Sequence, residues 1–151
     1  FENSLVTGSV DFIFGEGTAL FENCEIRSLL SNTYVTAAST PLNQPYGLVF
    51  HNSRFTAPDD VVDVYLGRPW RQFAATTIIN STLDGHIHSA GWHNWGDASK
   101  EATSRYAVSG NKGAGAMSPK RVSWQHTLEP EQAAKYTQAH ILPGWNPKKA
   151  I

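Results

Sequence analysis

Two motifs of this chain each place a single charged side chain inside an otherwise apolar stretch. Residues 8–15 read GSVDFIFG and carry Asp11, and residues 65–70 read YLGRPW and carry Arg68. In the first motif, the period-two alternation predicts a strand from which Asp11 projects, with Phe14 on the opposite face. A lone carboxylate on a packed strand is a candidate for binding or chemistry.

The second motif predicts a stiff turn that presents a cation and a ring. Gly67 and Pro69 flank Arg68, so the chain leaves regular strand pairing there and directs Arg68 and Trp70 outward. The carboxylate of Asp11, the fork-shaped guanidinium and the flat indole together suit the binding of an anionic sugar.

An internal repeat indicates what positions these side chains. The pattern of an apolar residue, Asn, a small residue, any residue and an apolar residue recurs at Asn3, Asn23, Asn52 and Asn80, which lie 20, 29 and 28 residues apart. Such spacings are typical of solenoid coils. Short strands without a helical stripe between them predict an all-β fold, a right-handed parallel β-helix in which the asparagines are architectural.

The length and the repeat predict one domain over residues 1–151, with coils over about 1–95 and long loops and a closing segment over about 96–151. A short C-terminal helix is expected near Glu129, with Thr127 as its possible cap. The chain opens at Phe1, without Met and already inside the repeat. We therefore expect a fragment whose upstream coils are missing.

Composition excludes several classes of function. Lys and Arg total 12 against 13 Asp and Glu, which gives no electrostatic case for nucleic acid, and no apolar run is long enough to span a membrane. Cys24 is the only cysteine, so no intrachain disulfide is expected, and its neighbours predict burial. We expect no metal site from the histidines at 86, 88 and 93, and a solvated loop from the aspartates at 59, 60 and 63.

Taken together, these motifs resemble the C-terminal part of the domain of the pectinesterase (pectin methylesterase) family. The resemblance rests on residues 8–15 and 66–70, on Gly91-Trp92 with Trp95, and on 113–124, in the family's order. It implies a right-handed parallel β-helix that needs no metal or organic cofactor. It also implies removal of methyl esters from galacturonosyl units of pectin, giving pectate and methanol. Whether Trp92 and Trp95 line a groove or cover the core stays open.

The resemblance also implies roles for individual residues. Asp11 falls on the position of the family's nucleophile, and Arg68 on the residue that holds and polarises that carboxylate. Trp70 and Phe14 fall on aromatic positions that line the sugar groove. A carboxylate nucleophile would form an acyl-enzyme and so divide one difficult step into two.

Two features of the family's site have no counterpart ahead of Asp11. The family's general acid Asp and oxyanion Gln lie upstream of the nucleophile, and residues 1–10 contain Glu2 as their sole acid and no Gln. We expect the fragment alone to be poorly active or inactive. The sequence also departs from the family pattern at 106–108 and at Ala114, which concerns loop shape.

Pectin is therefore the expected partner, with secretion or periplasmic export inferred from it, and a monomer is expected for the full-length domain. Two other functions remain as alternatives. One is a non-catalytic carbohydrate-binding β-helix, and the other is a pectate-lyase-like polysaccharide lyase, which would need a calcium cluster.

Overall fold

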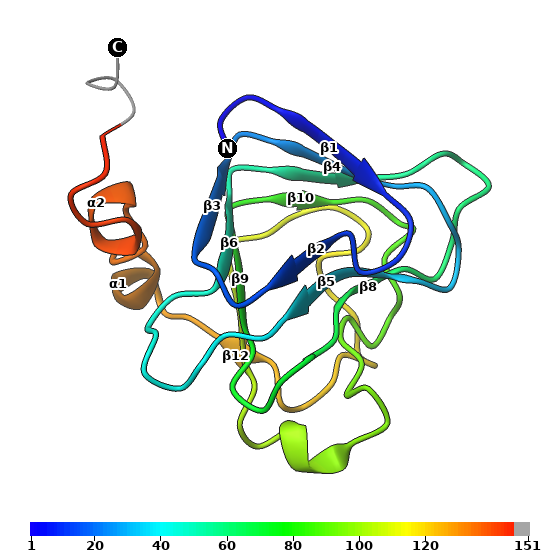
Figure 1. The fold of residues 1–151 in the computed structure, drawn as a ribbon. Helices are drawn as coiled ribbons and strands as arrows, with labels where there is room; N and C mark the ends of the chain where they lie inside the picture. The colour runs from blue at the N-terminus through cyan, green and yellow to red at the C-terminus, as the bar shows by residue number, and fades with distance from the viewer. Residues whose placement is uncertain (147–151) are drawn as a thin grey trace.

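The chain winds into a coil of short parallel strands in this computed structural model, which describes residues 1–146 (Figure 1). One sheet contains, in order, β1 (Leu5–Gly8), β4 (Glu25–Ser28), β7 (Arg54–Thr56) and β10 (Thr82–Leu83). A second contains β3 (Ala19–Glu22), β6 (Leu48–His51), β9 (Ala75–Ile79), β11 (Arg105–Ser109) and β12 (His126–Thr127). A third contains β2 (Ile13–Gly15), β5 (Tyr34–Ala38) and β8 (Tyr65–Gly67).

Each of the first three turns of the chain, from β1 to β9, adds one strand to each sheet, so neighbouring strands come from successive coils and pair in parallel. The expected parallel β-helix is confirmed. Apolar side chains from all three sheets fill the interior, where Val35, Phe50, Phe55 and Ile78 have no exposed surface. Phe21 and Phe50 stack with their ring centres 4.7 Å apart, which continues the register of β3 on β6 through the core. Cys24 is buried, as expected, and unpaired.

The repeated asparagines form the corner between the second and the first sheet. Asn3, Asn23, Asn52 and Asn80 all have positive φ, between 50° and 53°. Asn tolerates this left-handed conformation better than most residues because its short polar side chain bonds locally. The side-chain amide of Asn23 donates to Oδ1 of Asn3 on the preceding coil. Their architectural role is confirmed.

The coil extends further along the chain than the repeat suggests. We expected it to end near Trp95, but β11 pairs with β9 over five residues, and β12 pairs with β11. At the corner after β11, Gly110 has φ 62° and stands where the earlier coils have Asn. A Cβ there would lie 2.3 Å from Oδ1 of Asn80, so glycine makes the same turn without this clash. The asparagine repeat therefore ends at Asn80, although the coil continues through β11 and β12.

The C-terminal segment packs on the outer face of the second sheet. It contains α1 (Pro130–Ala133) and α2 (Gln138–Ile141), which lie beside β3, β6 and β9 (Figure 1). The short 3-10 helix η1 (Ala98–Lys100) precedes β11. Glu129 caps α1 in a reciprocal arrangement with Gln132, so the expectation of Thr127 as the cap is wrong, and Thr127 belongs to β12. No helix within residues 1–146 is long and apolar enough to cross a membrane.

Candidate active site

Asp11 lies in a turn between β1 and β2. The continuous strand that we predicted over residues 8–15 is wrong, because Asp11 has φ 49° and breaks it. Its backbone N–H donates to the carbonyl oxygen of Tyr34 at 2.8 Å, which fixes the turn to the next coil. The turn also shifts the alternation, since Ile13 is buried whereas Phe14 is 65% exposed. Phe14 therefore faces solvent, which simple alternation did not predict.

Arg68 follows directly after β8, and close packing of two coils sets its position. Its backbone N–H donates to the carbonyl oxygen of Thr36 at 2.9 Å. A Cβ on Gly67 would lie 1.9 Å from Oγ1 of Thr36, so only glycine permits this approach of β8 to β5. We expected the chain to leave regular strand pairing at this point, and it does so only after Gly67, which is the last residue of β8 and still pairs with Thr36.

The side chains of Asp11 and Arg68, 57 residues apart in the sequence, form a two-pronged ion pair. Nε of Arg68 donates to Oδ1 of Asp11 at 3.0 Å, and Nη2 donates to Oδ2 at 2.6 Å. The side chains are 20% and 18% exposed, respectively. Charge-assisted bonds in this geometry are strong and directional. The pair therefore fixes the plane of the carboxylate while leaving it accessible to solvent.

Two aromatic rings cover the guanidinium of Arg68. Its central carbon lies 3.8 Å from the ring centre of Tyr34 and 3.7 Å from that of Trp95. Sequence reasoning missed Tyr34, which no motif contains, and left the place of Trp95 open. Trp92 is a core residue, 1% exposed, and its Nε1 donates to Gln125.

The other two predicted residues, Phe14 and Trp70, also contact each other. Their rings meet edge to face with centres 6.1 Å apart, and Trp70 is 39% exposed. Phe14 lies three residues after Asp11 and Trp70 two residues after Arg68, so both rings are tied to the ion pair by short segments. The structure thus brings the four predicted residues together as two contacting pairs. An exposed aromatic pair of this kind is suited to packing against the apolar face of a sugar ring.

The titratable groups around the ion pair are shifted by their surroundings. Burial lowers the pKa of His93, and the charges of Arg68 and His88 lower it further. Burial raises the pKa of Tyr65, with smaller contributions from Tyr34 and Asp63. His93 is therefore held in its neutral form across a wider range of pH than an ordinary histidine.

The aspartates at 59, 60 and 63 are exposed in the loop between β7 and β8. Within the described residues, no three or more His, Cys, Asp or Glu are grouped so that they could hold a metal ion.

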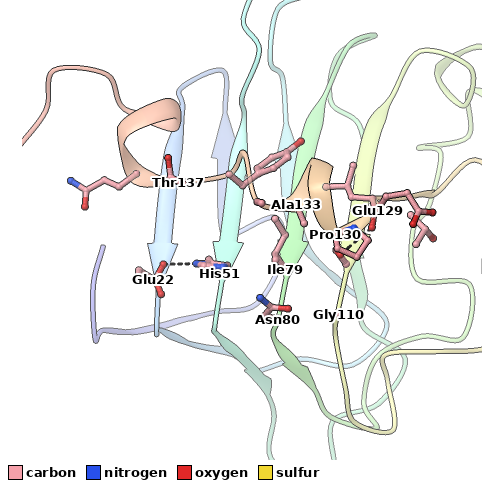
Figure 2. Close-up of a pocket in the computed structure, with 15 residues that line it drawn as sticks. Glu22, His51, Ile79, Asn80, Gly110, Glu129, Pro130, Ala133 and Thr137 are labelled. Atoms are coloured by element: carbon pink, nitrogen blue, oxygen red, sulfur yellow. Dashed lines mark hydrogen bonds and ion pairs between the residues drawn. The ribbon is translucent and has the colours of Figure 1, made fainter.

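A separate groove of about 800 Å³ lies between the second sheet and the C-terminal helices (Figure 2). Glu22 and His51 line it and pair with each other at 2.8 Å, and residues of α1 form its opposite wall. None of the four predicted site residues lines this groove. The groove is therefore distinct from the Asp11–Arg68 site.

Fold and site together define a right-handed parallel β-helix protein with a carboxylate–guanidinium pair on the outside of the coil. Comparison with known proteins gives the family. The model of the family described as Pectinesterase matches residues 1–145, and the chain belongs to this family.

Similar proteins agree in sequence and in fold. Pectinesterase 1 of Citrus sinensis is 40% identical over 136 residues, which cover 83% of this chain and 23% of that protein. Pectin methylesterase from carrot has a TM-score of 0.87 at 32% identity over 95% of this chain and 50% of its own. A pectin methylesterase in complex with a hexasaccharide has a TM-score of 0.81 at 33% identity, covering 97% and 51%. The chain thus spans about half the length of these solved structures and about a quarter of that curated relative.

Proposed function

We propose that this chain carries the reaction centre of a carboxylic ester hydrolase that removes methyl esters from galacturonosyl units of pectin, giving pectate and methanol. The observation that carries the proposal is the two-pronged Asp11–Arg68 pair, which holds a partly exposed carboxylate in one orientation beside exposed rings. Membership of the pectinesterase family supports this reaction. The likeness to a pectin methylesterase in complex with a hexasaccharide supports pectin as the partner.

In the proposed reaction, Asp11 is the nucleophile. One of its carboxylate oxygens bonds to the ester carbonyl carbon, the bond from that carbon to the methoxy oxygen breaks, and the methoxy group leaves as methanol with one proton. The galacturonosyl group then stays on Asp11 as an anhydride. Water adds to the anhydride, which restores the Asp11 carboxylate, leaves a free galacturonate and releases two protons, one of which replaces the proton that methanol took. Arg68 aligns the carboxylate before attack and receives it again after hydrolysis.

The proposal assigns binding of the sugar to the exposed rings. Phe14 and Trp70 would pack against the apolar face of a galacturonosyl ring and so place its ester over Asp11. The reaction as written needs no metal and no organic cofactor. Because pectin is a cell-wall polymer, we also propose that the protein acts outside the cell or in the periplasm.

The proposal also predicts weak activity for the chain on its own. In the family that the sequence resembles, the general acid Asp and the oxyanion Gln precede the nucleophile. Residues 1–10 offer Glu2 as their only acid and no Gln, so the proposal assigns both roles to another segment or molecule. Loss of a single oxyanion donor costs about 100- to 1000-fold in rate, and loss of acid catalysis about 100- to 10000-fold.

The test is to incubate the chain, and its Asp11→Ala variant, with highly methylated pectin. Methanol and unsaturated sugar ends are measured in parallel. Methanol release by the parent chain but not by Asp11→Ala supports the esterase. Unsaturated ends that disappear with a chelator would instead indicate a lyase. If neither product forms even when the upstream half of a related pectinesterase is supplied, while methylated oligogalacturonide still binds, the chain is a carbohydrate-binding β-helix.

A further inference from the structure

The guanidinium of Arg68 is enclosed on both faces and held at one edge. A planar guanidinium has two faces, and two rings at 3.7 and 3.8 Å from its central carbon cannot share one of them. Trp95 therefore covers one face and Tyr34 the other, while Asp11 binds the edge through Nε and Nη2. Both rings gain cation–π attraction, and they leave Arg68 little freedom to rotate away from the carboxylate.

Tyr34 is a rigid wall of this enclosure. It belongs to β5, pairs in register with Tyr65 on β8, and stacks on the Tyr65 ring with centres 5.3 Å apart. His88 stacks in turn on the Tyr65 ring, with ring centres 4.1 Å apart. This ladder of rings is part of the coil. Its position is therefore set by strand pairing.

Trp95 is the opposite wall, and it lies on a loop with a strained backbone. Its φ is 64°, a left-handed value that is unfavourable for a bulky residue. His93 stabilises this backbone conformation, because its Nδ1 accepts a hydrogen bond from the backbone N–H of Trp95 at 3.0 Å. The backbone N–H of His93 donates in turn to the carbonyl oxygen of Gly67 at 3.1 Å, which ties the loop to the residue before Arg68.

We propose that Trp95 is a positioning residue of the site: it holds the Arg68 guanidinium flat against Tyr34 so that its edge stays on Asp11, and neutral His93 keeps Trp95 in place. This proposal rests on the proposed function in one respect only, namely that Arg68 aligns the Asp11 carboxylate for attack. Trp95 itself need not touch the reacting atoms.

The chemistry of His93 follows from its hydrogen bond. Nδ1 can accept the Trp95 N–H only when that nitrogen carries no proton. The groups that face His93 are Arg68 and His88, which carry or can carry positive charge, and the rings of Tyr34 and Tyr65. Burial and these two charges disfavour the imidazolium. Protonation of Nδ1 at low pH would remove the bond and release Trp95.

The test measures how well Arg68 is held, without any turnover. Hydrogen exchange of the Arg68 Nε–H is followed by NMR in the parent chain and expressed as protection relative to free arginine. In Trp95→Leu, which keeps bulk but lacks a flat face, we expect protection to fall about tenfold. In Trp95→Phe, which keeps a ring, we expect less than about a threefold fall. Trp145→Leu, at an exposed site near α2, is the control and is expected to change nothing.

A second pair of variants tests His93 and keeps the proposal open to refutation if Trp95→Leu does not fold. Asn at position 93 offers an acceptor two residues before Trp95, as Asn94 does for Gly96, and it does not titrate. We expect His93→Asn to keep Arg68 protected from pH 8 to pH 5, His93→Leu to lose protection throughout, and the parent chain to lose it only at the acid end.

Equal protection in the Leu and Phe variants of Trp95, or in the Asn and Leu variants of His93, would overturn the proposal. These measurements are independent of the reaction. If the Trp95 and His93 variants change the exchange of the Arg68 Nε–H as predicted but no methanol is released, the proposed function alone is refuted. If methanol is released but these variants exchange the Arg68 Nε–H as the parent chain does, the positioning role alone is refuted.

Discussion

Gly67→Ala is expected to destabilise the coil where it carries Arg68. The new Cβ would lie 1.9 Å from Oγ1 of Thr36 and 3.0 Å from the Thr36 carbonyl oxygen, and both residues are buried. Thr36 cannot simply turn away, because its Oγ1 donates to the carbonyl oxygen of Leu66 at 2.9 Å. Overpacking costs about 1–3 kcal/mol. Loss of the buried hydrogen bond adds about 1–3 kcal/mol.

The sum, about 2–6 kcal/mol, is a large part of the stability of an ordinary domain, and it corresponds to a fall in Tm of roughly 4–24 °C. Urea and thermal unfolding followed by circular dichroism measure it. Gly17→Ala is the matched control, because Gly17 is exposed and a Cβ there meets nothing within 4 Å. Its free energy of unfolding should stay within about 0.5 kcal/mol of the parent value.

A double variant separates the clash from any other effect of alanine. Thr36→Ala removes the atom that the new Cβ would strike, so Gly67→Ala should cost at least about 1 kcal/mol less in the Thr36→Ala background than in the parent chain. If Gly67→Ala is as stable as Gly17→Ala, or if the two costs simply add, the account of why glycine stands before Arg68 is refuted.

Three further predictions concern single side chains. Burial raises the pKa of Tyr106, and its hydroxyl has no hydrogen-bond partner among the described residues, so Tyr106→Phe should leave Tm unchanged or raise it; a fall of several degrees would show an overlooked partner. Burial lowers the pKa of His86, so the unfolded chain takes up the proton first as pH falls below about 6.5, and the free energy of unfolding should decrease from pH 7 to pH 5. Urea unfolding of His86→Phe should show a shallower decrease, and an identical slope would contradict the assignment. Arg68→Lys keeps the charge but cannot bind Asp11 with two prongs, so methanol release should fall roughly 10- to 100-fold in whichever form of the protein is active, and an unchanged rate would refute the need for the fork.

Much of the fold could be predicted from the sequence because the corner of each coil needs a left-handed residue. Asn3, Asn23, Asn52 and Asn80 supply it, and their spacing gave the coil. The same physics explains where the prediction stopped, since Gly110 adopts that conformation without carrying the Asn signal. The end of the coils was therefore placed too early.

The charged pair could be predicted from motifs, but its surroundings could not. Asp11 itself takes a positive φ, and the period-two rule that we applied across it assumes an extended backbone throughout. Tyr34 and Trp95 meet Arg68 because successive coils bring residues some 30 positions apart into contact, and no local pattern records such a pairing. The roles proposed for Asp11, Arg68, Trp70 and Phe14 remain predictions.

The central claim is that the Asp11 carboxylate attacks the ester. Its most direct test compares methanol release from highly methylated pectin by the parent chain and by Asp11→Asn, both supplied with the upstream half of a related pectinesterase. Asn matches Asp in shape but is a poor nucleophile. The account predicts steady methanol release from the parent and none above background from the variant, with both folded by circular dichroism. Equal release from the two proteins would contradict it.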